Sequence, residues 1–413
     1  MDNAHIATDE ELAELLMSID SSAVINSFFD GVPEISGLND YWLVRTESGK
    51  YYADFTTNGY IGVGYNDIAL NDVKKSTPEE LKQLLRDKEN SGMQLTLDID
   101  DAALTGDEVD IQSSDQKIAI AAEQLYAFVN KISKDDLVLV PSKRSKTFSL
   151  GRVLDNNPYE LNALPAEYDN MNYEHSPYLK RYHVKWLGSF NRDDADSKLY
   201  KMIFSQKAVN KINKYRDVIN RAVFPIYILD DDVHVTFTVT ELDNISMQSF
   251  GEFIYKFSLL LNEIEKNANP SAKANVQSPG PIETITKSKK AIAIGLTVLA
   301  VTGGASAMAY GGELEVAGVK VSLNGVLTQQ AQDNKINAEA SSIKEETQSK
   351  STPDTTKELT KNVEIVQKAY DLKVSINDLG LDLPKGKTQR LQHMLNKMNE
   401  KNSPASDTEE HTN

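Results

Sequence analysis

Two β-prone runs open the folded part of this 413-residue chain: Tyr41-Trp42-Leu43-Val44-Arg45 and Tyr60-Ile61-Gly62-Val63-Gly64-Tyr65. Aromatic and β-branched residues favour strands, and Asn58-Gly59 supplies a turn before the second run. The alternating glycines Gly62 and Gly64 leave one face of that strand bare. A bare face indicates either the close approach of a ligand or chain segment, or a tight barrel corner.

More strands and several helices are predicted downstream of these runs. The expected strands span 136–141, 148–153 and 182–187. The expected helices span 8–19, 77–86, 116–132 and a segment from Ser205 onward, the second of them with Thr77 as its N-cap. Strands and helices are mixed along the chain, which predicts an α+β fold.

The second half predicts a hairpin, a helix and a linker. The hairpin candidate covers 226–240, with Asp230-Asp231-Asp232 at its turn. Ser249 and Glu252 form a capping box for the helix that follows. Residues 267–290 combine three prolines with Ser, Ala and Asn, which is typical of a linker.

A run of twenty-one residues without a charge extends from Ala291 to Gly311, directly after a cluster of lysines. At 1.5 Å per residue a helix of this length spans roughly 31 Å, the thickness of a bilayer's hydrocarbon core. Gly303, Ala307 and Gly311 lie four residues apart, and such small residues let helices pack closely in lipid. We therefore expect a single-pass, self-associating transmembrane helix with residues 1–290 in the cytoplasm. A buried, glycine-rich helix is the alternative.

The net charge of −17 comes from the first 140 residues, which hold 10 Lys and Arg against 27 Asp and Glu. Because an acidic surface repels a phosphate backbone, any nucleic-acid contact is expected in the middle third. From Lys143 to Arg221 there are 15 basic and 9 acidic residues. This excess indicates either a phosphate track or scattered solvated charge. The acidic N-terminal third, including Glu10, Glu11 and Glu14, is a candidate surface for a partner protein.

The motifs of common enzyme chemistry are missing from the sequence. It has no cysteine, and none of its six histidines pairs with another at a metal-ligand spacing. No phosphate-binding loop occurs. Asp230-Asp231-Asp232 fits either a solvated turn or the Mg²⁺ site of a nuclease. These observations favour a protein that is not an enzyme and that uses no cofactor or metal.

The ordered strand runs resemble PUA/EVE-type reader domains of bacterial restriction and antiviral-defence proteins. The resemblance covers residues 40–223 and rests on the runs that begin at Tyr41, Asn58, Asp135 and Tyr182, together with Leu150-Gly151-Arg152-Val153. It implies a small bent β-barrel with helical insertions, in which aromatic residues take up a flipped or modified base and basic residues hold phosphates. Carried over, the aromatic residues are Trp42, Tyr60, Tyr65 and Trp186, and the basic ones are Arg45, Lys143, Arg144 and Arg152. Aromatic residues in a barrel can also simply form its core.

Together these predictions describe a membrane-anchored, non-enzymatic sensor of an antiviral-defence system, whose cytosolic barrel binds a nucleic-acid-derived ligand. A membrane-tethered scaffold that recruits a partner protein and a metal-dependent nuclease are the alternatives. The predicted segments are an N-terminal helical segment (1–39), the reader domain (40–223), a hairpin-helix unit (224–266), a linker (267–290), the transmembrane segment (291–311) and a polar, helical or disordered tail (312–413).

Overall fold

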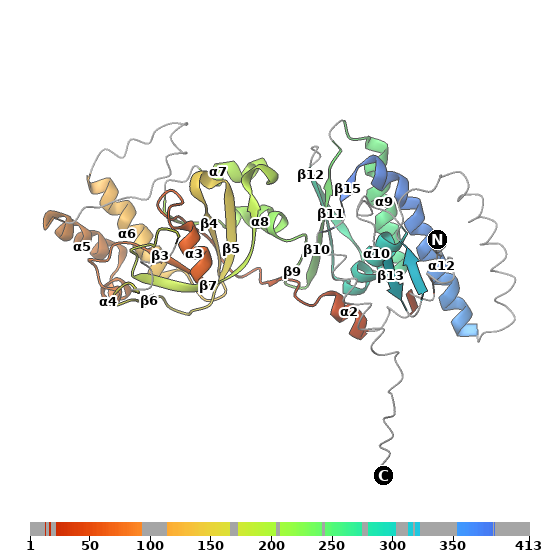
Figure 1. The fold of residues 1–413 in the computed structure, drawn as a ribbon, viewed down its shortest axis with the longest axis horizontal. Coiled ribbons are helices and arrows are strands. Elements are labelled where there is room, and N and C mark those ends of the chain that lie inside the picture. Colours follow the sequence, from red (N-terminus) through yellow and green to blue (C-terminus); the bar gives the residue numbers. More distant parts are fainter. Residues whose placement is uncertain are drawn as a thin grey trace, which may run out of the picture. The chain divides into compact units, whose positions relative to one another are not determined.

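The computed structural model divides the chain into two compact units. Unit 1 is formed by Met1–Glu34 and Pro225–Asn413, and unit 2 by Ile35–Phe224. Each unit has its own β-sheet and helices (Figure 1). The residues that the structure describes are 13, 16, 17, 22–92, 114–165, 172–203, 207–241, 244–274, 280–302, 313–316, 319–322, 353–382 and 384.

Unit 2 is built on a seven-stranded sheet with the order β3-β7-β5-β4-β2-β8, and β6 pairs with β7. Among the described strand pairs of unit 2, β2–β4 is parallel and the others are antiparallel. The strands are β2 (Tyr41–Val44), β3 (Tyr60–Val63), β4 (Leu137–Pro141), β5 (Thr147–Val153), β6 (Tyr159–Glu160), β7 (Lys180–Asn191) and β8 (Val209–Lys211).

The unit 2 sheet is curled but open. Its strand order ends at β3 and β8, and no pairing among the described strands joins these two. The register between β5 and β7 shifts between Leu150 and Gly151, where Leu187 of β7 is the extra residue, and such a bulge bends its strand. A Cβ at Gly151 would lie 2.2 Å from Val184 Cγ1, so glycine is required for this close approach. The closed barrel predicted from the sequence is therefore wrong, because the curvature produces only an open, curled sheet.

The helices of unit 2 pack around a core that includes one face of this sheet. Alternate strand residues, such as Trp42 and Val44, face this core together with Leu125 and Phe128 of α6. The helices are α3 (Tyr52–Asn58), α4 (Leu70–Lys75), α5 (Pro78–Asn90), α6 (Ser114–Asn130), α7 (Tyr200–Ile203) and α8 (Arg216–Val223), with 3₁₀ turns at Lys143–Ser145, Arg192–Asp194, Ser197–Leu199 and Asn213–Tyr215. The predicted start of α5 is confirmed, since Thr77 and Glu80 form a capping box.

The structure bears on two local predictions in unit 2, the bare strand face and the helix from Ser205. The bare face left by Gly62 and Gly64 is occupied by a chain segment, because the Tyr178 side chain lies 3.1 Å and 3.4 Å from where their Cβ atoms would stand. The helix predicted from Ser205 is wrong in its first part. There the short strand β8 pairs with β2, and helix α8 begins only at Arg216.

Unit 1 is built on a six-stranded sheet with the order β1-β9-β10-β12-β11, and β15 pairs with β10. Its strands are β1 (Glu34–Ile35), β9 (Ile226–Leu229), β10 (Asp232–Val239), β11 (Ser271–Ala274), β12 (Gly280–Thr286) and β15 (Leu381–Asp382), and a separate hairpin joins β13 (Glu313–Val316) to β14 (Val319–Ser322). The helices are α2 (Ser22–Phe28), α9 (Met247–Ile264), α10 (Lys289–Val301) and α12 (Pro353–Asp378). The predicted hairpin is confirmed as β9–β10, with Asp230 in a left-handed turn conformation.

Helix α10 occupies the region predicted to cross a membrane, and it is a core helix of unit 1. It has 13 residues, which corresponds to roughly 20 Å at 1.5 Å per residue, less than a bilayer core. Ala291, Ile292 and Leu296 are fully buried in the core that α9 and α12 also form. In the described part of the chain, no helix combines the length and apolarity that a membrane crossing requires. The predicted fold class, which included a transmembrane helix, is therefore wrong. The predicted helix-packing residues Gly303, Ala307 and Gly311 lie outside the described residues.

The predicted linker and tail also contribute to the unit 1 fold. Strand β12 lies within the linker segment, 267–290, and pairs with β10 from Val233↔Thr286 to Val239↔Gly280. Helix α12 lies within the predicted tail, and its buried residues Ile365, Ala369 and Leu372 join the same core as α9 and α10. Prolines near the start of β12 mislead a composition-based prediction, because they only break hydrogen bonding locally.

Candidate ligand pocket at Trp42

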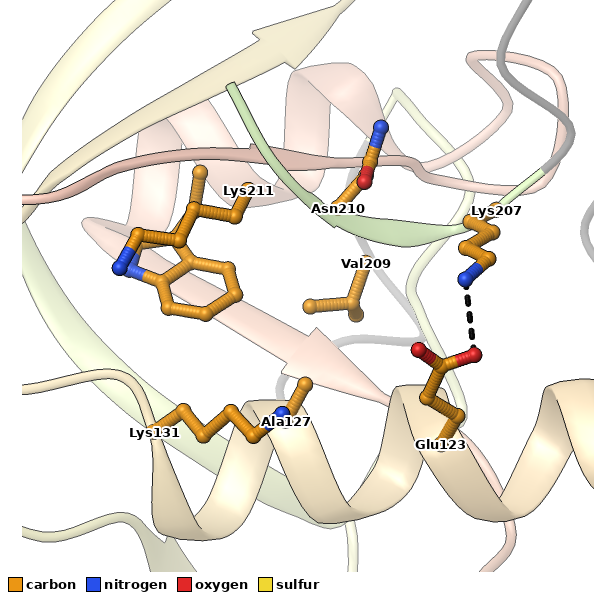
Figure 2. A pocket seen from close by; sticks show the side chains of 8 residues that line it. Glu123, Ala127, Lys131, Lys207, Val209, Asn210 and Lys211 are labelled. Carbon is orange, nitrogen blue, oxygen red and sulfur yellow. Dashed lines mark hydrogen bonds and ion pairs between the residues drawn. The ribbon is translucent and has the colours of Figure 1, made fainter. Parts of the chain in front are cut away.

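A pocket of about 220 Å³ lies between the edge of the unit 2 sheet and helix α6 (Figure 2). Strands β2 and β8 form one wall, and α6 forms the other. The lining residues are Trp42, Glu123, Ala127, Lys131, Lys207, Val209, Asn210 and Lys211.

Strand register places the key side chains of the pocket. Trp42 of β2 pairs with Lys211 of β8, and Val44 pairs with Val209, so these side chains project from the same face of the sheet. The period of two along β8 puts Val209 and Lys211 on one side, and Lys207 precedes the strand. On α6, Glu123, Ala127 and Lys131 follow at four-residue spacing and therefore share one helix face. The small Ala127 sits between the two charged residues and leaves space for the pocket.

The floor of the pocket is a fixed indole. Trp42 is only 3% exposed, and its Nε1 donates to Asp136 Oδ2 at 3.0 Å. The same carboxylate accepts from the backbone N–H groups of Ser133 and Asp40, both at 3.0 Å. Burial raises the pKa of Asp136, against the effect of these hydrogen bonds. The hydrogen bond to Asp136 thus orients the indole before any ligand arrives.

Three ammonium groups surround the pocket, and two of them have carboxylate partners. Lys207 Nζ lies 2.7 Å from Glu123 Oε2, and Lys211 Nζ lies 2.6 Å from Asp40 Oδ2. Lys131 lies over the Tyr126 ring, 5.6 Å from its centroid, and has no carboxylate in salt-bridge range among the described residues. The three lysines therefore outnumber the two carboxylates, and Lys131 carries the uncompensated charge.

Asp40 couples the rim of the pocket to the floor. Burial raises the pKa of Asp40, but hydrogen bonds from Asn213 and Lys211 outweigh burial and hold it below its ordinary value of 3.8. Asn213 Nδ2 donates to Asp40 Oδ1 at 2.7 Å, and the Asp40 backbone N–H donates to Asp136. Asp40 thus holds Lys211 with its carboxylate and Asp136, the partner of Trp42, with its backbone N–H.

The size and polarity of the pocket restrict what it can hold. Pockets that enclose a drug-sized ligand measure roughly 300–1,000 Å³, so this pocket admits one compact or flat group. Its apolar surface comes from Trp42, Ala127 and Val209, and its charged surface from three lysines and Glu123. Ammonium groups bind phosphate or carboxylate oxygens, and an indole offers an apolar contact to a planar ring. A compact ligand with a planar ring and an anionic group matches both features.

Tyr60, which the sequence predicted as a pocket residue, belongs to a buried hydrogen-bonded cluster elsewhere in unit 2. Its hydroxyl donates to Asp54, and the Arg181 guanidinium lies 3.9 Å from the centroid of its ring. The fully buried Asp54 carboxylate also accepts from the Ser176 backbone at 2.7 Å and lies 2.9 Å from His175 Nδ1. This Asp54 cluster ties helix α3 to the segment that precedes β7.

Trp186 and Tyr65 also lie apart from the Trp42 pocket. Trp186 Nε1 donates to the Phe55 carbonyl at 3.1 Å, and the Phe55 ring lies 4.8 Å from that of Tyr60. Trp186 and Tyr60 therefore share Phe55 as a neighbour. Tyr65 has a left-handed backbone, and its carbonyl accepts from Lys180 Nζ at 3.0 Å. None of these three aromatic residues lines the pocket.

The four predicted phosphate-contacting residues do not line the pocket either. Arg45 is buried, and its backbone N–H donates to Ala208 beside β8. Lys143 and Arg144 are exposed in the 3₁₀ turn between β4 and β5, and Arg152 is half-buried on β5. Of the eight predicted site residues, the structure places only Trp42 at the pocket.

Sequence reasoning missed the remaining lining residues for an identifiable reason. Lys207, Val209 and Lys211 were expected on a helix, where Lys207 and Lys211 would share one face and Val209 would point elsewhere. In β8 the alternation puts Val209 and Lys211 on one face, and Lys207, just before the strand, lines the same pocket. This alternation was the available signal, but three residues of strand are too short to distinguish from a helical spacing.

The comparisons with known proteins bear on this part of the chain. Residues 41–213 match the model of a family described as a domain of unknown function (DUF8426). This match lies within unit 2 and includes every residue that lines the pocket. No curated protein and no solved structure matches the chain.

Proposed function

We propose that unit 2 is a non-enzymatic reader that binds a nucleic-acid-derived ligand at the Trp42 pocket, and that the protein acts as a sensor in bacterial antiviral defence. The observation that carries the proposal is the combination of one fixed indole with three lysine ammonium groups around about 220 Å³. The membrane anchor expected from the sequence forms no part of the proposal, because α10 belongs to the core of unit 1.

The electrostatics of the pocket support an anionic ligand. Lys207 and Lys211 are half-exposed and already paired with carboxylates. A ligand phosphate would therefore replace a carboxylate as the partner of each lysine. Among the described residues, no carboxylate competes for Lys131, so its ammonium group is the one most available to bind a phosphate oxygen. A hydrogen bond between charged groups contributes about 1.5–3 kcal/mol, which suffices to select a phosphorylated ligand over its neutral analogue.

The sequence resemblance supports the nucleic-acid part of the proposal. The strand runs at 41–45, 58–65 and 135–141 resemble those of PUA/EVE-type readers, which take a base into a pocket. Trp42 belongs to the first run and lines the pocket. The small volume fits a single base or terminal phosphate, so a strand would present only one of its nucleotides.

The fluorescence of Trp42 offers a direct test. The chain has two tryptophans, so the Trp186→Phe variant of the full chain leaves Trp42 as the only tryptophan. We would titrate this protein at low salt with AMP and with a 5′-phosphorylated single-stranded DNA. Saturable quenching is expected, and Lys131→Gln should weaken it about tenfold, or about 1.4 kcal/mol. Binding of AMP alone would indicate a free nucleotide, and binding of the strand alone a nucleic-acid end.

A matched control uses Lys88, which is exposed on α5 and does not line the pocket. Lys88→Gln should leave both titrations unchanged, because it alters net charge equally without touching the site. A flat fluorescence signal with both ligands, in a protein whose circular dichroism is normal, would rule out the reader function. The defence role predicts in addition that Lys131→Gln reduces protection of host cells in phage plaque assays.

A further inference from the structure

The Trp42 pocket has two chemically different ends. The ion pair between Lys207 and Glu123 joins the β8 wall to the α6 wall at one end (Figure 2). Lys211 comes four residues later on the β8 wall, and Lys131 comes eight residues later on α6, about 12 Å along the helix axis. Among the lining residues, the second end therefore carries two ammonium groups, whereas the first carries one ammonium group and one carboxylate.

The middle of the pocket is apolar. Val209 and Ala127 lie between the charged residues of their walls, and the Trp42 indole adds further apolar surface. A flat ring in this middle part would direct one edge toward the end with the ion pair, and an anionic substituent toward the two ammonium groups at the rim. A mononucleotide has this arrangement, because its base edge and its phosphate lie at opposite ends of the molecule.

The ion pair between Lys207 and Glu123 is available to a ligand. Lys207 Nζ lies 2.7 Å from Glu123 Oε2, and the two side chains are 40% and 57% exposed. An exposed pair of this kind contributes only about 0–1 kcal/mol, so a ligand replaces it at little cost. Once the pair opens, Lys207 offers an ammonium donor, and beside it Glu123 offers two acceptor oxygens.

The four bases differ in how they satisfy a donor beside two acceptors. Guanine carries the acceptor O6 next to two donors, N1–H and N2–H2, so it pairs with the ammonium group and with both carboxylate oxygens. Adenine has one amino group and one ring-nitrogen acceptor on the same edge, which leaves one carboxylate oxygen without a donor. Cytosine and uracil hold a carbonyl oxygen where guanine holds its 2-amino group, and that oxygen would face the carboxylate.

We infer that the Lys207–Glu123 pair recognises guanine, and that the ligand of the Trp42 pocket is a guanine nucleotide. The inference rests on the proposed reader function and narrows its ligand class. Glu123 is the specificity-determining residue, because hydrogen bonds to a charged acceptor are the strong ones. A pocket that only attracted phosphate would bind it better without a carboxylate in its lining. A pocket that distinguishes bases requires such an acceptor, since specificity depends on the difference between two affinities.

Titrations with three mononucleotides test this inference. We would use the full chain with Trp186→Phe, so that Trp42 reports binding, and compare GMP, IMP and AMP. GMP should bind about tenfold more tightly than IMP, which lacks only the 2-amino group, and at least about tenfold more tightly than AMP. Glu123→Gln should bring GMP and AMP to within about threefold of each other. The ratio is decisive, because removing one negative charge near the phosphate affects all three nucleotides alike.

Glu79→Gln is the matched control. Glu79 is exposed on α5, pairs with Lys82 at 3.7 Å and does not line the pocket, so its replacement should leave the ratio of GMP to AMP affinity unchanged. A second arm uses two 5′-phosphorylated DNA strands that differ only in their terminal base, guanine or adenine. A guanine preference in the strands identifies a nucleic-acid end as the source of the ligand, and a preference in the mononucleotides alone identifies a free nucleotide.

Two results would overturn the inference while leaving the reader function intact. The first is equal binding of GMP and AMP, with no preference between the two strands. The second is a guanine preference that persists unchanged in Glu123→Gln. Absence of quenching by every nucleotide and strand would instead reject the reader function itself, and the guanine assignment with it.

Discussion

Replacing Leu296 with alanine tests whether α10 is a structural part of unit 1. Leu296 is fully buried, and its neighbours in the core come from α9, α12 and the sheet. If α10 instead left the core to enter a membrane, the folding of unit 1 would not depend on this side chain. The change therefore separates the two interpretations of the uncharged run that begins at Ala291.

The expected loss of stability follows from the atoms removed. Leu296→Ala deletes three carbon groups, and each buried methylene contributes about 0.8 kcal/mol, so the transfer cost alone is about 2.4 kcal/mol. The cavity adds to this cost when the surrounding side chains cannot collapse, which raises the total to as much as about 5 kcal/mol. Gly295, the preceding residue, already packs tightly, because a Cβ there would lie 3.0 Å from Leu261 Cδ2. We therefore expect Leu296→Ala to lower the free energy of unfolding by about 3–4 kcal/mol.

Urea unfolding of the full chain in buffer without lipid measures this loss. Far-UV circular dichroism follows both units, whereas Trp42 and Trp186 both lie in unit 2 and report on that unit alone. With a urea dependence of about 2 kcal/mol per molar, the unit 1 midpoint should fall by about 1.5–2 M. Val374→Ala, at a half-exposed position of α12, is the control and should change stability by less than about 0.5 kcal/mol. Equal, negligible shifts for both variants would refute the core assignment of α10.

Three further changes test the interior of unit 2. Trp42→Phe removes the hydrogen bond to Asp136 and should cost about 1–3 kcal/mol by urea unfolding; an unchanged midpoint would contradict the fixed indole. Asp54→Ala leaves the donors of Ser176 and Tyr60 without their buried acceptor, and should cost about 3–5 kcal/mol, measured by Trp fluorescence. Asp40 has a lowered pKa, so its stabilisation is complete above pH 3.8 and is lost as pH falls through the folded pKa. The difference in unfolding free energy between the native chain and Asp40→Asn should thus be constant from about pH 7 to 5 and shrink below about pH 4; a constant difference throughout would exclude this coupling.

Local patterns identified several elements of the fold from sequence. The runs at 41–45 and 60–65 form β2 and β3, and the alternating pattern after Asp230-Asp231-Asp232 forms β10. Thr77 caps α5 as its residue type predicts. The capping box proposed at Ser249 was misplaced, since α9 begins three residues earlier, with Ser246 as its N-cap. Patterns of this kind succeed because strand alternation and end capping depend on near neighbours along the chain.

The errors arose where distant segments decide the outcome. The uncharged run after Lys290 has the composition of a membrane helix, but the partners of α10 in the core are α9 and α12, which are far from it in sequence. The proline-containing segment at 267–290 becomes a strand because β10 offers it a hydrogen-bonding edge. Composition describes how much apolar surface must be hidden, and not whether lipid or protein hides it.

The sequence by itself determined the strand-forming runs, the acidic first third and the place of Trp42 in the first of these runs. Only the tertiary structure decided which residues line the pocket with Trp42: Lys131 at the end of α6, and Lys207 and Lys211 at β8. It also decided that Tyr60 and Trp186 pack around Phe55 instead. The reason is physical: a residue's type restricts what it can bind, but a site arises only when folding brings residues from distant segments together. Here the pairing of β2 with β8 and the packing of α6 over both strands create the pocket.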